Sequence, residues 1–201
     1  MSTPAPLAGL KVLEFDAIGL VPFCGMMLAD HDAQITRPHG QPNGIDAGEE
    51  DMLLRGRAEQ IPLDLKSKEG RVKILNLVAD FDVLLEGHRP GVMERLGIGP
   101  EECHAVNPKL VYCRITGYGQ TGPLAINPGH DINYIAHTGA LHAIGAADQP
   151  PPPPLSLIGD FGGRGLLGAF GVLAAVISAH TTGKGSVVDA AMVMEPLCKW
   201  L

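Results

Sequence analysis

The sequence predicts an α/β domain built on a parallel sheet. Short apolar runs typical of buried strands alternate along the chain with apolar or amphipathic segments of helical length, and strands that alternate with helices pair in parallel. The 201 residues, 45% of them hydrophobic, are enough to bury the core of one such domain. We therefore expect one main domain.

The first elements resemble the start of a βαβ unit. Residues 9–15 (GLKVLEF) form a short run typical of a strand, and residues 22–30 form a compact apolar segment of helical character. The connection between them contains DAIGL at residues 16–20 and lacks the GxGxxG turn of dinucleotide-binding domains. A nicotinamide cofactor is therefore not indicated.

The middle of the chain predicts a loop and three further extended segments. Residues 38–58 are polar and rich in glycine, which is typical of a loop, and residues 61–65 resume an extended pattern. Residues 82–86 and 109–116 are apolar enough to be buried strands. Before these two segments, Ser67 with Gly70 opens a helix, whose apolar residues fall mostly on one face: Val72, Ile74, Leu75, Leu77 and Val78.

The last third predicts a connector, a long helix and one more strand. The proline run at 150–154 is a rigid extended connector. A long apolar helix follows Asp160 and ends at residues 182–185 (TGKG), and residues 187–189 begin a strand. The most apolar stretch, residues 165–179, is too short for an ordinary membrane span. We therefore expect a buried helix and no membrane association.

Charge and cysteine content exclude several functions. The net charge is −7, whereas binding to nucleic acid requires a basic surface. Cys24, Cys103, Cys113 and Cys198 are far apart and show no CxxC spacing, so neither a metal site nor a disulfide framework is predicted. Residues 1–11 lack the pattern of a secretory signal. We expect a cytoplasmic protein that binds no nucleic acid.

His130 is the first candidate for chemistry. It stands where a loop passes into a helix, beside Gly129, Asp131 and Asn133, and this concentration of donors and acceptors suits a general base. Surface histidines and hydrogen-bonded core histidines are, however, commoner than catalytic ones. The residues alone leave both interpretations open.

Asp160 is the second candidate. It precedes glycines and an apolar helix, which is the pattern of a helix N-cap. A cap uses one carboxylate oxygen, so the other oxygen is available to a pocket. The glycines would let a ligand approach backbone N–H groups at the helix start, where the dipole favours the negative charge of an enolate. Spacing alone favours the structural role.

Six cations lie in or beside the loops and strand ends of the first half. On the connection side of a parallel sheet such residues would hold phosphate groups, although scattered surface arginines give the same pattern. The six are Arg37, Arg55, Arg57, Lys66, Arg89 and Arg95.

Seven segments together resemble, in order and spacing, the class III CoA-transferase superfamily. They are PLAGLKVLEF, LDLKSKEG, DVLLEGHRPGVMERLGIGPEE, NPKLVYCRITGYGQTGP, GHDINY, GDFGG and TGKGSVVDAAMV, and they cover nearly the whole chain. The GHDINY segment at residues 129–134 resembles the α-methylacyl-CoA racemase branch, because transferases usually lack a histidine there.

This resemblance implies a Rossmann-like large domain, a smaller domain, an interlocked homodimer and a place in fatty acid metabolism. The implied reaction interconverts 2R and 2S 2-methylacyl-CoA thioesters by 1,1-proton transfer through an enolate. His130 and Asp160 would be the two acid/base groups, with no metal or redox cofactor. The acyl-CoA substrate would contact Arg37, Leu63, Asp64, Leu65, Lys66, Gly87, His88, Arg89, Arg95, Gly129, Asp131, Ile132, Asn133 and Tyr134.

The chain also departs from the family pattern. Family members are much longer, so we expect residues 1–190 to form the N-terminal portion of the large domain and residues 191–201 a divergent tail. The small domain, and a glutamate that pairs with the catalytic histidine, would then be missing. Arg164 stands where glycine is usual and would either bind a carbonyl or phosphate group or block the pocket. The segment after Ala33 is shorter than usual, which weakens the equivalence of Arg37.

Three functions stay open on these grounds. The first is the racemase. The second is a class III CoA-transferase in which Asp160 is a nucleophile that forms an anhydride with the acyl group; His130 argues against it, because a transferase has no evident use for a second proton carrier. The third is a truncated, non-catalytic CoA-binding or assembly module.

Overall fold

A parallel sheet of six strands forms the centre of the computed structural model, which describes residues 5–15, 17, 19–39 and 58–193. The strand order is β3-β2-β1-β4-β5-β6, and each neighbouring pair is parallel. The chain therefore builds one half of the sheet outward from β1 and then returns to build the other half from β4, as in doubly wound folds. The predicted α/β class is confirmed. The strands are β1 (Lys11–Glu14), β2 (Gln34–His39), β3 (Ala58–Pro62), β4 (Val83–Glu86), β5 (Val111–Thr116) and β6 (Ser186–Ala191).

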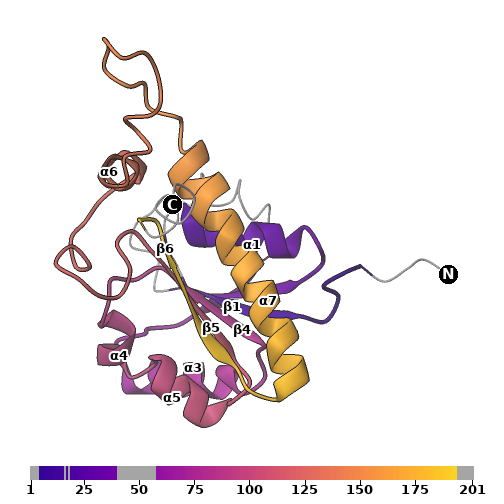
Figure 1. Cartoon of the computed structure of the whole chain (residues 1–201). Coiled ribbons are helices and arrows are strands. Elements are labelled where there is room, and N and C mark those ends of the chain that lie inside the picture. The colour runs from indigo at the N-terminus through magenta and orange to yellow at the C-terminus, as the bar shows by residue number, and fades with distance from the viewer. Residues whose placement is uncertain (1–4, 16, 18, 40–57, 194–201) are drawn as a thin grey trace.

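Helices cover both faces of the sheet. Figure 1 shows α1 and α7 on one side and α3, α4 and α5 on the other. Each face has its own hydrophobic core: Val12 and Cys113 face α1 and α7, whereas Leu13 and Tyr112 face the other helices. This alternation follows from the opposite directions of successive side chains along a strand. The helices are α1 (Leu20–Ala29), α3 (Lys68–Val78), α4 (Val92–Leu96), α5 (Pro100–Val106), α6 (Asp131–His137), the π-helix η1 (Leu157–Gly165) and α7 (Leu166–Thr182).

Two boundaries differ from the prediction. Pro38 and His39 belong to β2 rather than to a loop, and the extended segment predicted at 61–65 begins earlier and ends at Pro62 as β3. The helix α3 also buries a narrower face than expected, because Val72 is 51% exposed. The structure adds α4 and α5, which were not predicted. The expected tail from residue 191 is described only as far as residue 193, and its divergence stays a prediction.

Ser67 caps α3 as the sequence indicates. Its hydroxyl accepts the Gly70 N–H at 2.9 Å, which satisfies one of the free donors at the helix start. We expect Ser67→Ala to lower the free energy of unfolding by about 1 kcal/mol, measured by urea denaturation. Ser67→Thr keeps the acceptor and is the control; an equal loss in both variants would contradict the cap.

The two last helices are continuous and longer than predicted. Together η1 and α7 span 26 residues, Leu157–Thr182, which by length and composition is enough to cross a membrane. The argument that the apolar stretch is too short for a span was therefore wrong, because η1 extends it. In this structure Val172, Val176 and Ala179 pack α7 against the sheet, and core helices of soluble domains can be equally apolar. That the protein does not associate with a membrane stays a prediction.

Candidate active site

A cavity of about 480 Å³ lies at the carboxyl-terminal edge of the sheet. Among its lining residues, Gly87 directly follows β4, Gly117 follows β5 and Met192 follows β6. Ala17 lies just beyond β1. In doubly wound sheets the ligand binds at this edge, where the strand order reverses, and here that point lies between β1 and β4. The position of the cavity therefore indicates a ligand site.

The cavity brings together the two candidate acid/base residues. His130 and Asp160 both line it, although His130 immediately precedes α6 and Asp160 lies within η1. Neither sequence position predicts that meeting, which depends on how η1 packs against α6. Five further residues expected to contact the substrate also line the cavity: Gly87, His88, Arg89, Gly129 and Tyr134.

His130 occupies the N-cap position of α6. Its backbone is extended, and its N–H donates to Asn133 Oδ1 at 2.9 Å. This bond fixes the main chain, while the His130 side chain is exposed at the cavity. Asn133 was expected to contact the substrate, but the structure gives it this positioning bond and does not place it, or Ile132, in the cavity wall.

Asp160 is not a helix cap, so the structural interpretation of this residue was wrong. The helix begins at Leu157 with Ser156 at the N-cap position, and Asp160 lies inside it. Its N–H donates to Asp131 Oδ1 at 3.0 Å, so this N–H is not open to an enolate. π-Helical turns occur frequently at functional sites.

The environment of Asp160 favours its protonated form. Burial raises the pKa of its carboxyl group, and the negative charge of Asp131 raises it further. A hydrogen bond from Ser156 and the nearby His130 act in the opposite direction, but the pKa stays above its ordinary value. A carboxyl group whose pKa is raised is better suited to both donating and accepting a proton near neutral pH.

Tyr134 forms part of the cavity wall. Its ring is buried and packs edge-on against Tyr118, with 4.8 Å between ring centroids. The ring lies so close to Gly117 that a Cβ at that position would overlap it. Burial raises the pKa of the Tyr134 hydroxyl; Asp160 also raises it, whereas Arg89 lowers it. The hydroxyl therefore lies within electrostatic reach of both the carboxylate and the cation.

Sequence reasoning missed a group of buried charges beneath this cavity. Glu86, the last residue of β4, is 2% exposed and accepts the His88 N–H at 2.7 Å. Arg114, its register partner on β5, lies with Nε 3.6 Å from Glu86 Oε1 and also binds Glu94. The sequence did contain a signal for this pair, because Glu86 and Arg114 are charged residues in two otherwise apolar strands. The arrangement holds the turn that carries His88 into the cavity wall.

Glu86 titrates near neutral pH. Burial raises its pKa to about 7, even though the His88 N–H and the Arg114 guanidinium both lower it.

Thr116 is a second residue that sequence reasoning missed: it ends β5, is 7% exposed and lines the cavity. Its hydroxyl is buried and has no hydrogen-bond partner among the described residues.

Several expected substrate contacts lie away from the cavity. Arg37 is 4% exposed and pairs with the buried Glu14, with Nε 3.1 Å from Oε1. Leu63 lies in the core, while Asp64 and Lys66 are exposed, and the Lys66 N–H donates to Asp64 Oδ1 at 2.9 Å. Leu65 packs at the edge of the same core. These residues follow or lie on β2 and β3, and their contact with substrate stays a prediction.

The remaining cations divide into three cases. Arg95 is exposed on α4, and its guanidinium lies beside Gly91, close to the turn that carries Arg89. Arg164 is buried and does not line the cavity; burial raises the pKa of Cys113, and the charge of Arg164 lowers it. Arg164 therefore faces the sheet and neither binds substrate in this cavity nor blocks it. Arg55 and Arg57 lie outside the described residues.

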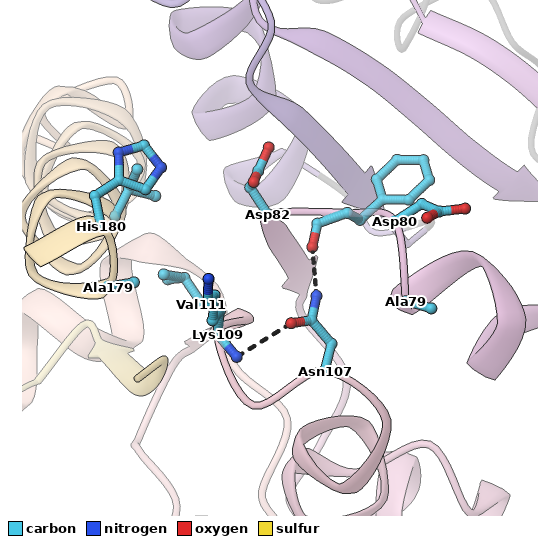
Figure 2. A pocket seen from close by; sticks show the side chains of 10 residues that line it. Ala79, Asp80, Asp82, Asn107, Lys109, Val111, Ala179 and His180 are labelled. Atoms are coloured by element: carbon cyan, nitrogen blue, oxygen red, sulfur yellow. Dashed lines mark hydrogen bonds between the residues drawn. The ribbon is translucent and has the colours of Figure 1, made fainter. Parts of the chain in front are cut away.

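A second cavity, of about 350 Å³, lies at the opposite edge of the sheet. Figure 2 shows Asn107 at its wall, donating to the carbonyl oxygen of Phe81 at 2.8 Å and accepting the Lys109 N–H at 3.1 Å. Asp82 and His180 also line it. It contains none of the expected site residues, so the first cavity is the candidate active site.

Within the part of the chain that the structure describes, no group of three or more His, Cys, Asp or Glu side chains is arranged to hold a metal ion. Cys24, Cys103 and Cys113 are buried and free, and Cys198 lies outside the described residues.

Comparison with known proteins places the chain in a family. Residues 7–199 match the model of CoA-transferase family III. The chain is 42% identical to the α-methylacyl-CoA racemases of Mus musculus and Homo sapiens, over 93% of this chain and 48% of each racemase. It is also 34% identical to a succinyl-CoA–D-citramalate CoA-transferase of Chloroflexus aurantiacus, over 92% of this chain and 49% of the transferase.

A solved structure agrees with the sequence matches. The crystal structure of Rv3272 from M. tuberculosis has a TM-score of 0.85 and 31% identity, covering 97% of this chain and 55% of that one. The chain thus spans about half the length of the curated relatives it matches. On this sequence match, fold and strand order, the chain belongs to CoA-transferase family III.

Proposed function

We propose that this chain carries the proton-transfer site of an acyl-CoA racemase, which interconverts the 2R and 2S forms of 2-methylacyl-CoA thioesters. The observation that carries the proposal is that His130 and Asp160 line one cavity from two different elements. Racemisation at one carbon needs two groups that can exchange protons on its opposite faces. The 42% identity to proteins named α-methylacyl-CoA racemase supports the same reaction.

In this mechanism each candidate residue serves as acid and as base. One of them removes the proton on C2 of the thioester, the electron pair moves onto the carbonyl oxygen as an enolate, and the other returns a proton to the opposite face. An imidazole does both near neutral pH, and the raised pKa of Asp160 brings the carboxyl group closer to the same range. The reaction as proposed uses no metal or redox cofactor.

The polar groups of the cavity suit a thioester and its enolate. Thr116 lines the cavity and its buried hydroxyl has no hydrogen-bond partner among the described residues, so it would serve as a donor if substrate binding exposed it; fixed donors are often the largest contribution to stabilising such an oxyanion. Arg89, which lines the cavity, and Arg95, which does not, are exposed cations that would attract the phosphates of CoA. Residues 63–66 follow β3 at the same carboxyl-terminal edge of the sheet. Because β3 is two strands from β1, they lie roughly 10 Å from the end of β1, a separation that an extended CoA molecule would span.

Solvent-deuterium incorporation tests the proposal. We expect the chain, incubated in deuterium oxide with one enantiomer of a 2-methylacyl-CoA, to place deuterium at C2 and to produce the other enantiomer. Mass spectrometry measures the first and chiral chromatography the second. The same assay with the C-terminal half of a racemase relative supplied tests whether the site needs that half. Absence of exchange under both conditions would contradict the proposal.

A class III CoA-transferase is the second candidate, because Asp160 lines the cavity and relatives named CoA-transferases match the chain. In that reaction the carboxylate attacks the thioester carbonyl, the thiolate of CoA leaves, and an aspartyl anhydride forms. Hydroxylamine would trap the acylated Asp160 as a hydroxamate, detectable by peptide mass spectrometry. This product, together with an unlabelled C2, would favour the transferase.

A further inference from the structure

Asp131 is a buried carboxylate next to both candidate acid/base residues. It is the first residue of α6 and only 8% exposed. Its Oδ1 accepts the Asp160 N–H at 3.0 Å. One side chain on α6 therefore holds the backbone of η1 at Asp160.

The shape of η1 is matched to this contact. A Cβ at Gly159 would overlap Asp131 Oδ1 and lie 3.1 Å from Ile135 Cγ2, so a side chain there would separate the two helices. Asp131 itself is not part of the cavity wall, which disfavours the substrate contact expected from the family resemblance. The contact instead connects the two elements that carry His130 and Asp160.

We propose that Asp131 is a positioning residue: it fixes the Gly159–Asp160 backbone relative to His130 and places a second carboxylate beside that of Asp160. His130 and Asp131 are adjacent in sequence, so one short segment sets the location of both acid/base groups. The catalytic consequence rests on the proposed racemase function, whereas the structural role rests on the contact alone.

The charges around Asp160 define what the second carboxylate does. After burial, Asp131 is the next largest cause of the raised pKa of Asp160, and His130 opposes it. Asp160 and Arg89 also act on the Tyr134 hydroxyl. The other elements packed on η1 contribute few titratable groups: Cys24 on α1 and His180 at the far end of α7, besides Arg164 of η1 itself. Removing the charge of Asp131 should therefore lower the pKa of Asp160.

Three variants separate the two roles. Asp131→Asn keeps an oxygen that accepts the Asp160 N–H but removes the charge, Asp131→Ala removes both, and Gly159→Ala keeps the charge but forces it away. Carbon-13 NMR titration of the Asp160 carboxyl group and hydrogen exchange of the Asp160 amide are the measurements. Asp148→Asn, which removes an exposed carboxylate, is the control for net charge.

We expect the pKa of Asp160 to fall in Asp131→Asn while its amide stays protected. In Asp131→Ala and Gly159→Ala the amide should exchange roughly tenfold faster or more, as the loss of one hydrogen bond implies. An unchanged pKa of Asp160 in Asp131→Asn, or an amide still protected in Asp131→Ala, would overturn the assignment. Both measurements are independent of activity, so they hold even if the chain racemises nothing.

Kinetics then distinguish positioning from substrate binding. For the enantiomer whose proton Asp160 removes, Asp131→Asn should move the acidic limb of the kcat/KM profile to lower pH and leave KM unchanged, because the base ionises more readily. A CoA contact would instead raise KM and leave the pH profile in place. That second result would return Asp131 to the role of a substrate contact.

Discussion

Replacing His130 with asparagine should strongly slow interconversion of the two 2-methylacyl-CoA enantiomers but preserve proton exchange of one of them. In a two-base site each group faces one side of C2, so Asp160 alone can still remove and return a proton on its own face. The lost transfer should slow interconversion by roughly 100- to 10,000-fold. The backbone bond from His130 to Asn133 does not involve the imidazole, so the start of α6 should be retained.

Asp160→Asn should give the mirror result, with exchange confined to the opposite enantiomer. Proton NMR in deuterium oxide, run separately on each enantiomer, measures the exchange, and chiral chromatography measures the interconversion. His142→Asn changes an exposed histidine that does not line the cavity and should leave both rates unaltered. If each catalytic variant lost exchange of both enantiomers equally, the site would not operate with two independent bases.

The strands that could be predicted are those whose sequences are mostly apolar and whose residues are buried on both faces of the sheet. Residues of β1, β4 and β5 are buried almost throughout, because helices cover both faces of a parallel sheet, and such strands appear as continuous apolar runs. The strand β2 does not appear as such a run, because its sequence QITRPH contains Arg37 and Pro38 side by side. Its burial depends on the pairing of Arg37 with Glu14 on the neighbouring strand, a tertiary contact that no local pattern reveals.

The residues of the site were predictable, but their geometry was not. The family resemblance identified His130 and Asp160, and the structure placed them in one cavity. The start of η1 was placed too late because Leu155 and Ser156 have φ values of 53° and 61°. Residues other than glycine rarely adopt such values, so nothing in their identity marks the turn that begins the helix. The contact from Asp131 to η1 is equally non-local.

The buried Glu86 should make the protein less stable as the pH rises from about 4.5 to about 7. Its pKa is about 7 in the folded chain against an ordinary value of 4.5, so the folded state binds this proton more tightly than the unfolded state does. The contribution is complete below pH 4.5 and is lost as the pH passes through 7. The two pKa values differ by about 2.5, and one pKa unit corresponds to about 1.4 kcal/mol. The resulting change in the free energy of unfolding is roughly 3 kcal/mol.

Glu86→Gln should remove this dependence. Urea denaturation between pH 5 and pH 8 should show the variant gaining stability relative to the original protein as the pH rises, because glutamine has no proton to lose. Glu94→Gln is the matched control, since Glu94 binds the same Arg114. Partial burial raises the pKa of Glu94 but the bond to Arg114 lowers it further, for a net decrease, so its contribution is lost only at lower pH and its effect should be constant over this range. Parallel curves for Glu86→Gln would mean that Arg114 and the His88 N–H keep Glu86 ionised throughout, and the turn beside the cavity would then carry a fixed negative charge at every pH at which racemisation is measured.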